Sequence, residues 1–178
     1  ARTVVLFAFD GCQSLDVTGP YEVLNSANVR KRKSAPGYRP IIASLRGGNV
    51  RANSGFVIGN TTALADLPQN VDTALIGGAD EELALALGSD PAVARWMRAM
   101  AAKARRYGER AICLAHEPAC RWGGTDYATV VTELESVDEK DIGPLYSYAV
   151  SWLSNLDATS EEWTAVAQLP WVEAVLVR

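Results

Sequence analysis

The chain has 178 residues, of which 48% are hydrophobic and 21% charged, and its formal net charge at pH 7 is −4. This composition is typical of a globular protein, and it excludes a membrane-spanning helix because no apolar run reaches the roughly 18 residues that a bilayer requires. The first residues, "ARTVVLFAFDG", place one arginine before a short apolar run, which favours a first strand over a secretory leader. We therefore expect a cytoplasmic protein that does not contact a membrane.

The first part of the chain alternates strand and helix patterns. The run "TVVLFAF" is continuous, apolar and β-branched, which predicts a strand buried on both faces. A helix is expected next, with Thr18 as its cap, Pro20 in its first turn and "RKRK" at its end. "YRPIIASL" then predicts a second strand, "RGGNVRANSGFVIGN" a small hairpin and "VDTALIGG" a third buried strand.

The segment "SDPAVARWMRAMAAKARRYG" has the clearest helix pattern of the sequence. Asp90 is expected at its cap, Pro91 in its first turn and Gly108 as its stop. "RAICLA" then predicts a fourth short strand. Strands that alternate with helices indicate an α/β fold with a flavodoxin-like, doubly wound and mostly parallel sheet.

The composition changes late in the chain. Residues 1–123 have 15 basic and 11 acidic side chains, a net charge of +4, whereas residues 124–178 have 2 basic and 10 acidic ones, a net charge of −8. In this tail, "YATVVTEL" and "WVEAVLV" predict strands, while "GPLYSYAVSWLSNL" and "TSEEWTAVAQL" predict helices, the second opened by a capping box from Thr159 to Glu162. We therefore expect an α/β domain over residues 1–123 and a divergent β-α-β module over residues 124–178, packed on the same sheet or as its own layer.

The cysteines and the histidine limit the metal and disulfide chemistry. Cys12, Cys113 and Cys120 are an odd number without Cys-x-x-Cys spacing, which predicts neither a disulfide scaffold nor a zinc knuckle. His116 is the one histidine of the chain, so it cannot build a multi-histidine metal site. We expect no metal and no other cofactor.

Several residues with possible site chemistry lie at the ends of predicted strands. Asp16 follows the first strand, Gly77 and Gly78 end the third, and Cys113 ends the fourth. Because strand carboxyl ends build the ligand site in an open α/β sheet, we expect these residues to face one crevice. Each also has a plainer interpretation: a helix entry for Asp16, a strand end for the two glycines, and a buried inert thiol for Cys113.

Over residues 2–113, the motifs "FDGCQSLDVTGPYEVL", "LIGGAD" and "ARRYGERAIC" resemble the ThiJ/PfpI superfamily of class I glutamine amidotransferase-like domains. Within it, the chain is most similar to isocyanide hydratases and to the sensor domains of AraC-type regulators. The resemblance implies that Cys113 is a nucleophile, that Asp16 is the neighbouring acid, and that backbone amides form an oxyanion hole. By position, the residues implied to bind substrate are Gly77, Gly78 and Leu114.

Such a site would support nucleophilic catalysis, since an ionised thiolate attacks while a carboxylate holds or moves a proton. The leading hypothesis is therefore a cysteine-dependent hydratase or hydrolase-like protein that acts on a small electrophilic molecule. One alternative is a non-catalytic ligand-sensing domain of an AraC-type transcriptional regulator, and another is a fusion that has lost the site. The expected partners are a small-molecule substrate or effector and a second copy of the chain in a homodimer. No direct nucleic-acid binding is expected, because no DNA-reading helix pair follows.

Overall fold

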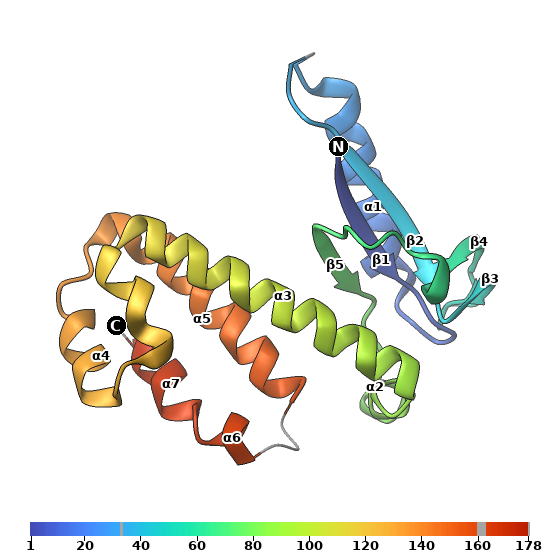
Figure 1. The fold of residues 1–178 in the computed structure, drawn as a ribbon. Helices are drawn as coiled ribbons and strands as arrows, with labels where there is room; N and C mark the ends of the chain where they lie inside the picture. The colour runs from blue at the N-terminus through green and yellow to red at the C-terminus, as the bar shows by residue number, and fades with distance from the viewer. Residues whose placement is uncertain (33, 160–162, 178) are drawn as a thin grey trace. The chain divides into compact units, whose positions relative to one another are not determined.

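The chain folds into two compact units, residues 1–93 and residues 94–178, in a computed structural model that describes residues 1–32, 34–159 and 163–177 (Figure 1). The division comes earlier than the boundary expected after residue 123. Among the described residues, no helix combines the length and the apolar character needed to cross a bilayer.

The first unit is built on a five-stranded sheet (Figure 1). The strands lie in the order β3-β4-β2-β1-β5, and every neighbouring pair is parallel except β3 and β4. The predicted α/β class with a mostly parallel sheet is therefore confirmed, as is the predicted hairpin. The strands are β1 (Arg2–Phe7), β2 (Tyr38–Ser44), β3 (Arg46–Arg51), β4 (Val57–Ala63) and β5 (Thr73–Ile76).

Strand β1 is an inner strand of the sheet and is buried, as its apolar sequence predicts. Its last four residues, from Val4 to Phe7, are all buried, because β2 and β5 pair with its two edges and helix α1 (Ser14–Arg30) packs beside it. The helix begins four residues before the predicted cap. Thr18 lies inside it and donates a hydrogen bond from its hydroxyl to the Ser14 carbonyl, so the prediction of Thr18 as a cap is wrong.

A short 3-10 helix, η1 (Leu64–Asp66), and helix α2 (Glu81–Gly88) complete the first unit. Helix α3 (Pro91–Ala115) starts in the last residues of the first unit. The Asp90 carboxylate accepts hydrogen bonds from two amides of the first turn of α3, so Asp90 is the cap, as predicted. Gly108 does not stop this helix, which runs on for seven more residues. The fourth strand expected over "RAICLA" is therefore wrong, since that segment is the end of α3.

Every secondary-structure element of the second unit, among its described residues, is a helix. The strands expected over "YATVVTEL" and "WVEAVLV" are helices α4 and α7, so the tail has no β-α-β module there. The predicted capping box ends at Glu162, which lies outside the described residues. After α3, the elements are η2 (Glu117–Gly124), α4 (Tyr127–Leu134), η3 (Glu139–Asp141), α5 (Ile142–Asp157), α6 (Trp163–Val166) and α7 (Leu169–Val177).

Helix spacing of apolar side chains explains why the two predicted strands are helices. In α4, Asp126 caps the first turn by accepting a hydrogen bond from the Thr129 amide, and Val130 and Leu134 are buried four residues apart. In α7, Val172 and Val175 are buried three residues apart. These spacings place the buried side chains on one face of a helix, whereas a strand would alternate them.

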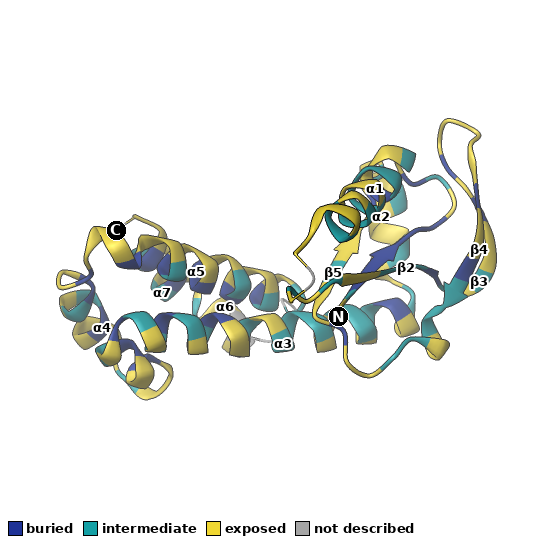
Figure 2. Ribbon diagram, turned by 90° about the horizontal axis from the view of Figure 1, so that it is seen from above, coloured by how far each residue is buried: buried dark blue, intermediate teal, exposed yellow. Residues whose placement is uncertain are grey.

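An aromatic core holds the second unit together, and its buried residues are dark blue in Figure 2. The rings of Trp122, Tyr148 and Trp152 follow one another, with centroid distances of 6.1 Å and 5.1 Å. Burial raises the pKa of Tyr148 above its ordinary value, so the phenol is neutral. Trp122, Tyr148 and Trp152 are therefore core residues, whereas Tyr127 and Tyr146 are exposed.

Candidate functional site

Asp16 and Gly78 meet in the first unit, although 62 residues separate them. Asp16 is exposed in the first turn of α1, and its Oδ2 accepts a hydrogen bond from the Gly78 amide at 2.9 Å. A Cβ added at Gly78 would lie 2.7 Å from that oxygen, so only glycine fits without a shift. The carboxylate therefore ties α1 to the segment that follows β5, and it occupies the amide that the resemblance assigns to an oxyanion hole.

Gly77 is close-packed against the same helix entry. A Cβ there would lie 3.2 Å from Val17 Cγ2 and 3.3 Å from Cys12 Cβ, so the glycine lets β5 end against the loop before α1. Cys12 is fully buried and is the free cysteine of the described residues. The structure thus brings Asp16, Gly77 and Gly78, three of the four residues expected to face one crevice, close together through packing and one hydrogen bond.

Cys113 and Leu114 lie in the other unit, in the last turn of α3. The Cys113 sulfur forms a disulfide with Cys120 in η2. The strand end expected at Cys113 is therefore absent, and Leu114, 78% exposed, is a helical residue. Helical amides bond to the carbonyl four residues before them, so the Leu114 amide is not arranged as an oxyanion donor.

A polar cluster surrounds His116 in the second unit. The imidazole is buried, with Nε2 3.4 Å from Ser136 Oγ and Nδ1 4.0 Å from Asp141 Oδ2. The order serine, histidine, aspartate is that of a catalytic triad, but the second distance exceeds a hydrogen bond. Ser136 also donates its hydroxyl hydrogen to the Glu133 carbonyl at 2.6 Å, so it is not prepared for attack. We interpret the cluster as a structural link between η2, α4 and η3.

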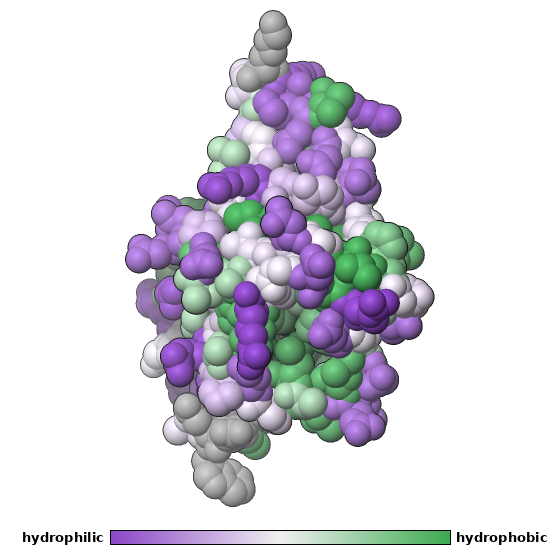
Figure 3. Space-filling model, turned by 90° about the vertical axis from the view of Figure 1, so that its right-hand side faces the viewer, coloured by the Kyte–Doolittle hydropathy of each residue, from purple (hydrophilic) through white to green (hydrophobic). Residues whose placement is uncertain are grey.

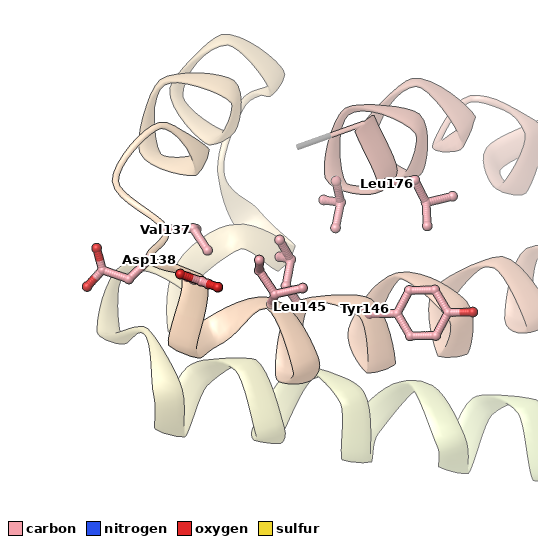
Figure 4. A pocket seen from close by; sticks show the side chains of 8 residues that line it. Val137, Asp138, Leu145, Tyr146 and Leu176 are labelled. Carbon is pink, nitrogen blue, oxygen red and sulfur yellow. The ribbon is translucent and has the colours of Figure 1, made fainter.

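Large hydrophobic side chains are exposed in both units, and green hydrophobic patches are visible on the face drawn in Figure 3. One set of such side chains surrounds a pocket of about 300 Å³ in the helical unit (Figure 4). In this view, Leu176 points from α7 toward α5, and Asp138 points outward at the rim. The lining residues are Val137, Asp138, Glu139, Ile142, Leu145, Tyr146, Val175 and Leu176.

This pocket was not predicted from the sequence, although α5 contains a signal for it. Ile142, Tyr146, Val150 and Leu153 follow at spacings of four, four and three residues, and all four are exposed. The other side of the same helix is buried. A helix that is apolar all round has two faces to cover, and only one is covered within the described chain.

The chain is similar to known proteins in two separate stretches. Residues 84–178 match the family model of the TRAP transporter T-component. Among solved structures, the chain is similar to Drosophila melanogaster DJ-1beta, with 17% identity, a TM-score of 0.48, and coverage of 58% of this chain and 52% of that one. Toxoplasma gondii DJ-1 has 14% identity, the same TM-score and the same coverage.

An AraC family transcriptional regulator from Pseudomonas putida has 20% identity and a TM-score of 0.39, with coverage of 46% of this chain and 49% of that one. The chain thus spans about half the length of the solved structures it matches. No curated protein matches it. Because the T-component model covers more than half of the residues and the whole helical unit, the chain belongs to the TRAP transporter T-component family.

Proposed function

We propose that the chain is a non-catalytic accessory protein of a TRAP transporter, and that its helical unit binds a protein partner. The observation that carries this proposal is the coincidence of the family match with the open apolar pocket, since both lie within residues 84–178. Exposed apolar surface with a polar rim is typical of protein interaction sites. The role of the first unit is then to carry or orient the helical unit.

The site contacts support a binding role over catalysis. A cysteine attacks as a thiolate, and the Cys113 sulfur is bonded to Cys120. Asp16 holds the Gly78 amide, so this donor already has a partner. The cysteine-dependent hydratase stays a prediction that needs a reduced Cys113, and the regulator sensor domain stays a prediction that needs a small-molecule ligand.

The disulfide also bears on where the protein works. Disulfides persist in oxidising compartments and are rare in the cytosol, where thiols are kept reduced. The Cys113–Cys120 bond joins the end of α3 to η2, next to the buried Ala119 and Trp122. We therefore propose an oxidising compartment for the helical unit, in place of the cytoplasm expected from the N-terminal sequence.

Thiol titration tests this assignment directly. Of the three cysteines, only buried Cys12 is free, so we expect one reactive thiol after denaturation without reductant and three after reduction. In the native chain, alkylation near neutral pH is expected to be slow because Cys12 is fully buried. Rapid alkylation of Cys113 in the native, unreduced chain would contradict the disulfide and would favour the enzyme.

Co-purification tests the proposed transporter role. We expect the full chain, co-expressed with the TRAP transporter subunits of the organism that makes it, to be retained by an affinity-tagged transporter in mild detergent. The control is an unrelated tagged transporter prepared in the same way. A chain that binds neither preparation, under conditions in which the transporter itself is active, would contradict the proposed function.

A further inference from the structure

An apolar stripe of exposed side chains runs along α5, and its first turns line the pocket together with the end of α7; we call the stripe and the pocket together the groove. On α5, four apolar side chains are exposed in succession. Their exposed fractions are 56% for Ile142, 64% for Tyr146, 40% for Val150 and 43% for Leu153. Leu176 of α7 is 47% exposed and closes one side of the groove at the pocket of Figure 4. The four α5 positions span three helical turns, about 17 Å at 1.5 Å per residue.

The charges around this groove are acidic. Asp138 and Glu139 line the pocket, and Glu173 and Asp157 are the charged residues of α7 and α5, which contain no lysine or arginine. The nearby Lys140 lies 3.2 Å from Asp138, and this hydrogen bond raises the lysine pKa, so one cation is already paired with the rim.

We propose that the groove binds an amphipathic helix of a partner protein, with an apolar stripe at i, i+4, i+7 spacing flanked by lysine and arginine. The inference rests on the proposed function, because it names the kind of surface that the partner presents. An apolar stripe in a groove is a recurring mode of helix recognition, and basic flanks complement the acidic rim. A helix of about three turns matches the length of the stripe.

The same charges argue against the two other occupants of an apolar groove. Pairing this face with a second copy would bring two acidic rims together, and like charges across an interface disfavour association. An anionic lipid surface would be repelled for the same reason. A basic amphipathic helix is the occupant that satisfies both the apolar stripe and the carboxylates.

Two designed peptides test the proposal with the full, unreduced chain. One is a fluorescein-labelled helix of leucine and lysine with leucine at a and d positions, and the other replaces each lysine with glutamate. We expect fluorescence anisotropy to give an affinity for the lysine peptide at least about tenfold above that for the glutamate peptide, with the difference shrinking as salt is raised.

Matched variants locate the binding surface. Leu176→Ser is expected to lower the affinity for the lysine peptide about tenfold, because it removes an apolar contact. The control is Leu85→Ser, at a leucine of α2 that is 66% exposed, which is expected to leave this affinity unchanged. Glu139→Lys is expected to lower the affinity for the lysine peptide and to raise the affinity for the glutamate peptide. Glu82→Lys on α2 is expected to change neither affinity. Circular dichroism and melting temperature confirm that each variant is folded.

Three results of the peptide measurements would overturn the groove assignment. These are equal affinity for the two peptides, no binding of either up to about 1 mM, and affinity that Leu176→Ser does not change. A dimer in sedimentation that Leu176→Ser dissociates would show a second copy as the occupant, and would also overturn the groove assignment.

Co-purification with the transporter separates the groove proposal from the proposed transporter role. If Leu176→Ser co-purifies normally, only the groove fails, and if the peptides bind but the transporter does not, only the transporter role fails.

Discussion

Replacing Trp152 with alanine is expected to lower the free energy of unfolding of the helical unit by about 3–5 kcal/mol. The indole is 4% exposed, and its centroid lies 5.1 Å from that of Tyr148. Its Nε1 donates a hydrogen bond to Gln168 Oε1 at 3.0 Å, and the Arg105 guanidinium lies 4.8 Å from its ring centroid. Alanine removes the packing, the hydrogen bond and the cation–π contact together, and it leaves a cavity in the core.

Trp152→Phe separates packing from hydrogen bonding. Phenylalanine keeps an aromatic ring beside Tyr148 but has no N–H, and Gln168 Oε1 still accepts a hydrogen bond from Arg105 Nη1 at 2.9 Å. The loss for phenylalanine is therefore expected to be smaller, about 1–2 kcal/mol. Chemical denaturation followed by circular dichroism at 222 nm measures both. Equal losses for the two variants would show that the ring kept by phenylalanine contributes little to stability, and a loss below about 1 kcal/mol for alanine would show that Trp152 does not organise the core.

The first unit was predictable because its strand signals are strong and local. "TVVLFAF" is an uninterrupted β-branched run, and the structure buries it between two parallel neighbours. The glycine pair after β5 and Asp16 also met as expected, because strand ends in a parallel sheet share one edge. Sequence could not show that the Asp16 carboxylate would be used on the Gly78 amide, since that depends on the distance between two loops.

The second unit is harder to predict from sequence because its β-branched residues favour strands by propensity. "YATVVTEL" and "WVEAVLV" are rich in valine, but their buried residues follow helical spacing, and tertiary packing overrides a modest β propensity. The error at "RAICLA" had a larger consequence. A strand over this segment would put Cys113 at a strand end, where the resemblance implies a nucleophile. In the structure, Cys113 lies in a helix and forms a disulfide with Cys120. An odd number of cysteines gave no reason to pair these two.

A substitution at Gly108 is the second change with a large expected effect on stability. The sequence suggested a helix stop, but Gly108 is buried in the middle of α3, where α5 comes close to it. A Cβ at this position would lie against Ser151 Oγ and 3.0 Å from the backbone Cα of Tyr148. The glycine is there because two helices approach closely, and Gly108→Val is expected to lower the free energy of unfolding by about 3 kcal/mol through overpacking.

Gly143→Val is the matched control, because Gly143 lies in the first turn of α5 with open space around the position of a Cβ. Valine has a higher intrinsic helix propensity than glycine, but Pro144 follows and disfavours the helical conformation of a β-branched residue before it, so this variant is expected to change the free energy of unfolding by less than about 1 kcal/mol. Denaturation of both variants in parallel therefore separates the steric cost at Gly108 from the effect of a valine in a helix. Equal changes in the free energy of unfolding for the two valine variants would contradict the close approach of α3 and α5 at Gly108. Such a result would also contradict the aromatic core and the groove, because both depend on where α5 lies.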